Sequence, residues 1–375
     1  MAKIALFGDF KVDEVAGLSI SEGLKNTLSS SDINVVNFEA PMRGAGKPIR
    51  KSGPSISQST DSPAWLEQHG FNVISLANNH TMDYGVGGME ATRKALSKTA
   101  TIGCGNWEEA YRPLVIKAED GMRVGFLACT HCEFGTLTDS YCEYEKGTAW
   151  LMHPDIDRAI QKVKTGGCDF LIVLAHAGVE YMDVPLPEIR DRYKRLIELG
   201  ADAVIASHPH VPQGWEMYQG KPICYSLGNF CFTKQKKGKM HARWYESLCC
   251  ILDIGRDHDL KMIITPVIYD QENHLILENT SKHFGEYLNN LNELLTDNEK
   301  YMESVNKEVK KLLSHYMNQF SRGGLGFNPF SIGFVKGLAE GCLGLGFFKK
   351  EHWLNNLQCE SHRWAILRAM KLKES

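Results

Sequence analysis

One stretch of the chain decides the fold, and it reads LPEIRDRYKRLIELGADAVIASHPHV over residues 186–211. Its first half carries apolar side chains at helical spacing, and Pro187 suits the first turn of a helix. Its second half contains a short apolar run, Ala203–Ala206, which is typical of a buried strand. His208 and His210 follow that strand directly. A helix, a buried strand and a polar strand end in this order predict an α/β domain with its chemistry at one edge of the sheet.

The same alternation extends over most of the chain. Buried strands are predicted at Lys3–Phe7, Ile33–Phe38, Asn72–Leu76, Arg123–Cys129, Phe170–Ala175 and Ala203–Ala206. Helices are predicted between them at Ser62–His69, Gly88–Lys98, Pro154–Lys164 and Leu186–Leu199. After Gly214, strand-like runs joined by turns predict hairpins at Pro222–Tyr225, Leu248–Ile254 and Lys261–Ile268. We therefore predict a catalytic domain over residues 1–278.

The remaining residues, 279–375, are predicted to form a helical accessory region. Apolar residues recur at spacings of three, four and seven between Phe284 and Phe320, which indicates one or two long amphipathic helices. The next stretch, Leu325–Phe348, is apolar but contains charged residues near its middle, so we expect no membrane span. Residues 351–373 predict a terminal helix. This region either packs over the catalytic domain, which we favour, or serves as a docking arm for a partner.

Composition narrows the class of protein. With 375 residues and 43% hydrophobic content, the chain can bury a large core. A formal net charge of -3 gives no global attraction to nucleic acid or to an anionic membrane. The eleven cysteines lack framework spacing, which favours reduced thiols and a cytoplasmic location. The first residues already resemble a strand, so we expect no signal peptide or N-terminal anchor.

Carboxylates follow the first two predicted strands. Asp9 comes directly after the first strand, where it either caps a turn or binds a ligand. Glu39 ends the second strand, where an ordinary salt bridge is the alternative. A second acid at the same edge of a sheet requires a cation to offset repulsion, which favours a metal.

The next two strand ends carry amides and imidazoles. Asn79 and His80 follow the third strand, with Asp83 opening a turn; either they ligate a metal, or Asn79 satisfies the turn while His80 bonds Asp83. His176 ends a later strand and is closely followed by Glu180 and Tyr181, although a capped core histidine remains an alternative.

The last two strand ends complete the pattern. His208 and His210 flank one residue, so on an extended backbone they point to opposite sides and are able to serve adjacent ions. This is the most specific metal signal in the chain. Gly228 and Asn229 end another strand, where either a structural turn or close approach of the backbone to a ligand explains them.

Taken together and in this order, the motifs resemble the CapA family of capsule and poly-γ-glutamate synthesis proteins. The stretches that carry the resemblance are Gly8-Asp9, Asn37–Pro41, Leu76–His80 with Asp83-Tyr84-Gly85, His176–Tyr181, Gly200–Val211 and Tyr225–Phe230. That family looks like a branch of the calcineurin-like metallophosphoesterases. The resemblance implies a four-layer αββα sandwich with a C-terminal helical extension and a site for one or two divalent metal ions, Mn, Fe or Zn.

The resemblance also assigns roles to single residues. It implies that Asp9 and His210 bind a first metal and that Glu39 stands where the bridging carboxylate stands. The ligands that it implies for the second metal are Asn79, His176 and His208.

The resemblance gives His80 and Asp83 roles in proton transfer. A third residue, Lys11, departs from the phosphoesterase pattern. The resemblance makes His80 an outer-sphere general acid, oriented by Asp83. The usual Asp-x-His motif of the phosphoesterases reads Asp9-Phe10-Lys11 here, so the first metal site loses an imidazole.

The function that this resemblance implies is a metal-dependent hydrolase or transferase in capsule or poly-γ-glutamate/polysaccharide biosynthesis, with metal-bound hydroxide as nucleophile. The expected substrate is an anionic polymer or a peptide-like molecule, and the expected partners are polymer-synthesis proteins. One alternative is a metal-assisted acid/base epimerase acting on a peptide-like substrate. Another is a non-catalytic scaffold subunit of a polymer-synthesis complex.

Some weaker features concern substrate contact. The candidate substrate-binding residues are Lys51, Glu180, Tyr181 and Asn229. The basic run Lys234–Lys239 is interpreted as a solvated loop. The run Cys129–Cys132 resembles half a zinc knuckle, but no second cysteine pair occurs at partner spacing, so we interpret it as ordinary core thiols.

Overall fold

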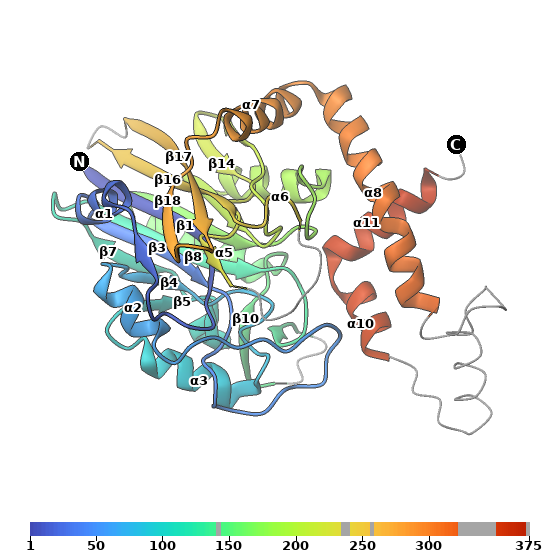
Figure 1. Ribbon diagram of the computed structural model, residues 1–375, viewed down its shortest axis with the longest axis horizontal. Helices are drawn as coiled ribbons and strands as arrows, with labels where there is room; N and C mark the ends of the chain where they lie inside the picture. Colours follow the sequence, from blue (N-terminus) through green and yellow to red (C-terminus); the bar gives the residue numbers. More distant parts are fainter. Residues whose placement is uncertain (140–143, 234–240, 256–258, 322–349, 373–375) are drawn as a thin grey trace.

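Two large β-sheets form the centre of the molecule (Figure 1). The computed structural model describes all residues except 140–143, 234–240, 256–258, 322–349 and 373–375. The apolar stretch Leu325–Phe348 and the basic run Lys234–Lys239 therefore lie outside the described residues.

The larger sheet has nine strands in the order β2-β18-β17-β16-β1-β3-β4-β5, with β15 paired to β1. Its strands are β1 (Ala2–Lys11), β2 (Ser19–Ile20), β3 (Ile33–Phe38), β4 (Val73–Ser75), β5 (Ala100–Ile102), β15 (Cys231–Phe232), β16 (Glu246–Ile254), β17 (Leu260–Asp270) and β18 (Leu275–Glu278). Strands β1, β3, β4 and β5 run parallel, so their carboxyl ends meet at one edge.

The second sheet has six strands in the order β13-β14-β12-β11-β8-β7. Its strands are β7 (Leu114–Lys117), β8 (Arg123–Thr130), β11 (Phe170–His176), β12 (Ala203–Ser207), β13 (Trp215–Tyr218) and β14 (Lys221–Cys224). Strand β11 runs parallel to both β8 and β12. A small third sheet contains β6 (Cys104–Asn106), β9 (Thr136–Leu137) and β10 (Lys146–Ala149).

Three apolar clusters show how the layers stack. One cluster lies between the two large sheets and joins Leu6 and Val35 to Ile172 and Ile205. A second cluster covers the outer face of the nine-stranded sheet with helices α1 (Glu22–Ser29), α2 (Ser62–Gln68) and α3 (Gly85–Ala95). The third covers the outer face of the six-stranded sheet with α5 (Pro154–Thr165), α6 (Pro187–Glu198) and helices from the C-terminal region. This order of layers confirms the predicted αββα sandwich with a C-terminal helical extension.

The described C-terminal helices are α7 (Lys282–Thr296), α8 (Asn298–Ser321), α10 (Lys350–Gln358) and α11 (Glu360–Lys371). Of these, α7, α8 and α11 contribute to the apolar cluster on the six-stranded side of the sandwich, and α10 packs against α8 and α11 (Figure 1). Val305 of α8 and Ile366 of α11 belong to the same cluster as Val173 of β11. The single terminal helix predicted for residues 351–373 is wrong, because Cys359 takes an extended conformation and separates α10 from α11.

The short helix α4 (Trp107–Ala110) completes the described elements. Among the helices of the described residues, none has the length and apolar character needed to cross a bilayer.

Candidate metal centre

The carboxyl ends of strands from both large sheets converge on one buried group of side chains. In the larger sheet, Asp9 of β1 pairs in register with Asn37 of β3. In the smaller sheet, His176 of β11 pairs with Ser207 of β12. The backbone N–H of His208 lies 3.3 Å from Asp9 Oδ2 and so joins the two edges.

Asp9, Glu39 and His176 form the centre of this group. Their nearest donor atoms all lie within 4.8 Å of one another. His176 Nδ1 is 3.6 Å from Asp9 Oδ1, and His176 Nε2 is 3.4 Å from Glu39 Oε1. Both carboxylates are completely buried. Two buried anions beside one imidazole match the arrangement that a divalent cation stabilises.

Asn37 links the two carboxylates and was not predicted as a site residue. Its Nδ2 atom lies 2.7 Å from Asp9 Oδ1 and 2.5 Å from Glu39 Oε2, so one amide donates to both. The sequence signal was present in the stretch Asn37–Pro41, where only the acid had been considered.

Asn79 and His208 extend the group beyond His176. Asn79 Oδ1 lies 3.1 Å from His176 Nε2, and His208 Nδ1 lies 3.1 Å from that same nitrogen. Burial lowers the pKa of His208, and the neighbouring imidazoles of His131 and His176 lower it further. His208 is therefore a neutral imidazole, which is the form that binds metals.

His210 lies on the Asp9 side. Its Nδ1 atom is 3.4 Å from Asp9 Oδ2 and 2.9 Å from Asn229 Oδ1. Burial alone lowers the pKa of His210, but its contact with Asp9 and the charge of Glu39 raise that pKa to about 9. Without a metal, His210 is thus the cation that balances Asp9. All six predicted metal ligands lie in this one group.

The backbone around the histidines is strained. His208 has a φ of 104° and His210 a φ of 59°, both in the region that favours glycine. Strained backbone conformations of this kind concentrate at functional sites, where they aim side chains. Gly8 is required for a steric reason, because a Cβ at this position would lie 1.8 Å from the carbonyl oxygen of Gly228.

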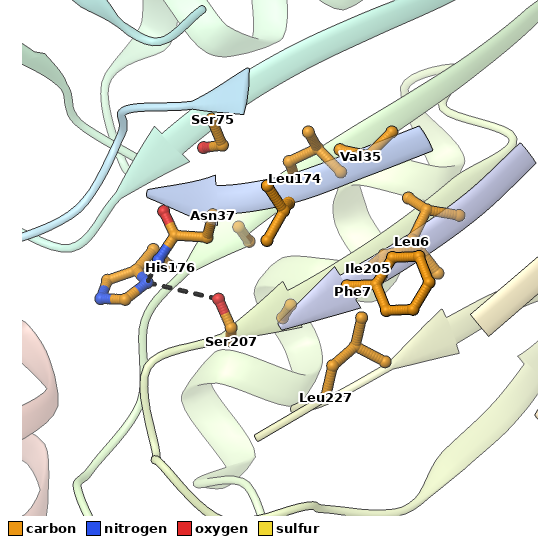
Figure 2. A pocket seen from close by; sticks show the side chains of 13 residues that line it. Leu6, Phe7, Val35, Asn37, Ser75, Leu174, His176, Ile205, Ser207 and Leu227 are labelled. Atoms are coloured by element: carbon orange, nitrogen blue, oxygen red, sulfur yellow. Dashed lines mark hydrogen bonds between the residues drawn. The ribbon is translucent and has the colours of Figure 1, made fainter. Parts of the chain in front are cut away.

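An apolar pocket lies behind the donor group, between the two sheets (Figure 2). Leu6, Val35, Leu174 and Leu227 line it, while His176 lies at its polar end with Ser207 Oγ 3.3 Å from Nδ1. Apolar surroundings of this kind strengthen electrostatic interactions at the donor group.

His80, Asp83 and Lys51 form a second set beside the donors. His80 Nδ1 lies 2.8 Å from Asp83 Oδ2, and the buried ammonium of Lys51 also bonds to Asp83. Lys51 Nζ is 3.3 Å from His80 Nδ1. The loop that carries Lys51 therefore folds back onto the site, with its ammonium paired to Asp83.

The remaining predicted substrate-binding residues lie on the His210 side. Tyr181 is 39% exposed, and its ring stacks near His241, with centroids 6.0 Å apart. Glu180 is partly buried, whereas Asn229 is fully buried and contacts His210.

Lys11 is the residue of the Asp9-Phe10-Lys11 stretch that departs from the expected Asp-x-His motif. Its Nζ lies 2.7 Å from Asp13 Oδ1 and 3.3 Å from the carbonyl oxygen of Thr233. The ammonium is thus bonded to Asp13 and Thr233.

Two more donors reach the group from the end of β8, and neither was predicted as a site residue. His131 and Glu133 follow that strand directly and are buried. The rings of His131 and His208 have centroids 4.3 Å apart. The run Cys129–Cys132 had been considered only for its thiols, although it ends a strand like every other site motif.

The residues present fit a divalent metal. His208 Nε2 is a buried atom without a hydrogen-bond partner, and Glu39 Oε1 has no hydrogen bond beyond its 3.4 Å ion-pair contact with His176 Nε2. Such orphaned donors and acceptors cost free energy unless a ligand satisfies them. Carboxylates and imidazoles together suit Mn, Fe or Zn.

The fold and the donor set define a two-sheet α/β protein with a candidate divalent-metal centre at its strand ends. The family model of the bacterial capsule synthesis protein PGA_cap matches residues 9–234, more than half of the chain. The protein belongs to this family.

Two curated relatives come from Bacillus. Over 216 residues the chain is 32% identical to the capsule biosynthesis protein CapA of Bacillus anthracis, covering 55% of this chain and 52% of the relative. Over 232 residues it is 30% identical to the PGA biosynthesis protein CapA of Bacillus subtilis (strain 168), covering 60% of each. The chain thus spans little more than half the length of these relatives.

Among solved structures, the calcineurin-like phosphoesterase YfkN from Bacillus subtilis is similar, with a TM-score of 0.42 and 14% identity. The match covers 70% of this chain and 90% of that one. The 5'-nucleotidase from Candida albicans SC5314 matches with the same TM-score and 8% identity, covering 73% and 53% of the two chains.

Proposed function

We propose that this protein is a divalent-metal-dependent hydrolase or transferase that acts on a phosphoryl or amide-type bond during synthesis of capsule, poly-γ-glutamate or a related polymer. The observation that carries the proposal is the buried group of Asp9, Glu39 and His176, whose donor atoms lie within 4.8 Å of one another. Membership of the capsule synthesis family supports the biological setting.

Asp9, Glu39 and His176 would hold an ion, with Asn79, His208 and His210 as the further proposed ligands. A bound divalent ion supplies Lewis-acid polarisation of a phosphoryl or carbonyl oxygen and lowers the pKa of water. The chain itself contributes a buried setting, because Asp9, Glu39 and His176 are almost completely buried and apolar side chains lie behind His176.

His80 is the proposed proton donor. Its Nδ1 is held by Asp83 at 2.8 Å, which leaves Nε2 to give a proton to a leaving group or accept one from water. Lys51 balances the charge of Asp83 and so fixes the orientation of the imidazole.

The proposed substrate is an anionic polymer or a peptide-like molecule. Tyr181 offers a partly exposed ring at the His210 side, Glu180 precedes it in the chain, and Asn229 contacts His210. We propose that Lys51 also contacts an anionic group of the substrate from its position beside His80 and Asp83. The nine cysteines of the described residues are free and buried, which supports a reducing, cytoplasmic location and hence intracellular precursors.

The test is turnover by the purified protein after chelation and reloading with Mn, Fe or Zn. Aryl phosphates, cyclic phosphodiesters and γ-glutamyl peptides are offered separately. Metal-dependent cleavage of one class is expected, and activity that is unchanged in the metal-free protein would refute the proposal. Incorporation of solvent deuterium without cleavage would identify the epimerase alternative instead.

The double variant His208→Ala/His210→Ala distinguishes an enzyme from a non-catalytic scaffold. Loss of polymer synthesis in cells that produce a stable variant protein is expected for an enzyme. Full synthesis by this variant would favour a scaffold. We propose that residues 279–375 act as a cover for the catalytic domain of residues 1–278, which the shared core of α8, α11 and β11 supports.

A further inference from the structure

The end of strand β8 brings two donors to the metal centre that no resemblance assigns. Thr130, the last residue of β8, pairs in register with His176 of β11. The residues that follow Thr130 therefore emerge beside the donor group. His131 is 0% exposed and Glu133 is 8% exposed, and His131 Nε2 lies 3.1 Å from Glu133 Oε1.

His208 faces both groups of donors. Its Nδ1 lies 3.1 Å from His176 Nε2, on the side of Asp9 and Glu39. Its Nε2 is buried and has no hydrogen-bond partner. Donor atoms of His131, Glu133 and His208 all lie within 4.8 Å of one another. This second group shares no residue with the group of Asp9, Glu39 and His176.

The unpaired nitrogen of His208 points to a ligand. His208 Nε2 is buried without a hydrogen-bond partner beside the buried pair of His131 and Glu133, whose Nε2 and Oε1 atoms are 3.1 Å apart. Native proteins rarely leave such atoms unpaired. Two imidazoles and a carboxylate are the donor set that binds Zn and similar ions in many proteins.

The C-terminal helix α11 holds His131 in the way expected of a metal ligand. Its ring nitrogen Nδ1 lies 3.3 Å from Ser361 Oγ and 3.7 Å from Cys359 Sγ. Histidines that bind metals through one nitrogen are commonly oriented by a partner on the other nitrogen. Glu360, itself buried, accepts from the backbone N–H of Cys132 at 3.0 Å and thereby fixes the β8 end.

We propose that His131, Glu133 and His208 form a separate divalent-metal site and that helix α11 orients its ligands. The C-terminal region then does more than cover the sheet, because Ser361 and Cys359 position a ligand. The inference rests on the proposed function only through His208, which both accounts treat as a ligand.

A wild-type crystal grown with Zn²⁺ tests the site without any mutation. The expected anomalous difference map has one peak within about 2.0–2.2 Å of a donor atom in each of His131, Glu133 and His208, and a separate peak at Asp9, Glu39 and His176. A peak at Asp9 alone would overturn this inference and leave the proposed function standing. A peak at His131 alone would support this inference and contradict the proposed function. No peak at either group would overturn both.

Metal analysis of matched variants gives an independent readout. The wild-type protein is expected to retain two Zn²⁺ ions per chain after dialysis, and Glu133→Gln is expected to retain one. Glu39→Gln serves as the matched variant at the other group and is also expected to retain one. Should Glu133→Gln fail to fold, His131→Asn replaces it. A full complement of ions in a folded Glu133→Gln or His131→Asn protein would overturn the inference.

Discussion

The two sheets contribute different chemistry to their shared edge. The nine-stranded sheet supplies the carboxylates Asp9 and Glu39, both completely buried and linked by the amide of Asn37. The six-stranded sheet supplies the imidazoles His176 and His208. Two buried carboxylates facing imidazoles across the edge form a donor set that a divalent cation between the sheets would balance, as proposed above.

Removing a carboxylate from the nine-stranded side should have the largest effect. Asp9→Asn withdraws a charged ligand, so we expect metal affinity to fall by about two orders of magnitude or more and turnover to disappear. Competition with a chelator measures the affinity. Asp13→Asn, which alters the partner of Lys11 outside the donor group, is the control and should retain the metal. Equal metal affinity in Asp9→Asn and the wild-type protein would contradict the assignment of Asp9 as a metal ligand.

His80 tests whether proton transfer is separate from metal binding. His80→Ala should lower turnover by about 10²–10⁴-fold, because the group that Asp83 orients is lost, while the metal content stays unchanged. Steady-state kinetics with parallel metal analysis measures both. A variant that loses its metal would place His80 among the ligands instead.

Asn37 tests how the two carboxylates tolerate each other. Asn37→Ala removes the amide that donates to both, so the free energy of unfolding of the metal-free protein should fall by about 1–3 kcal/mol. Urea unfolding in the presence of a chelator measures this loss. Repeating the measurement with Zn²⁺ should narrow the difference, since the ion then neutralises the carboxylates. A loss of the same size with and without the ion would argue against a metal between them.

The smallest expected effect concerns Glu216, a carboxylate on strand β13 of the six-stranded sheet that does not belong to the donor group. Burial raises the pKa of Glu216, but its ion pair with Arg190, at 2.9 and 2.7 Å, lowers the pKa overall. A lowered pKa in the folded state contributes stability above the unfolded pKa, and this contribution is lost as the pH falls through the folded value.

Glu216→Gln should therefore lower the free energy of unfolding by about 1 kcal/mol at pH 7 and by less near pH 3. Chemical denaturation at both pH values measures this, with metal content as the control. If the loss in free energy of unfolding grew as the pH falls, the pKa of Glu216 would be raised in the folded protein rather than lowered.

The sequence predicted the strands and helices of the sandwich well, because buried strands and amphipathic helices have distinct periods. Strand β3 spans the predicted residues Ile33–Phe38, and β8 exceeds its prediction by Thr130 alone. The division between α10 and α11 was missed, since nothing in the local pattern marks Cys359 as extended. Its neighbour Glu360 instead bonds to Cys132 and Trp150, which are distant in sequence.

The six metal-ligand candidates came together because each ended a predicted strand. Asn37, His131 and Glu133 were missed because their roles depend on contacts with side chains from other strands and helices. The contact of His131 with Ser361 joins residues that are 230 positions apart in the chain. No local spacing encodes such a contact.

Equilibrium dialysis of the chelator-treated protein against Mn²⁺ and Zn²⁺ tests the central claim most directly. If this claim holds, the wild-type protein takes up at least one ion per chain and Glu39→Gln takes up one fewer. A folded wild-type protein that takes up neither ion would contradict it.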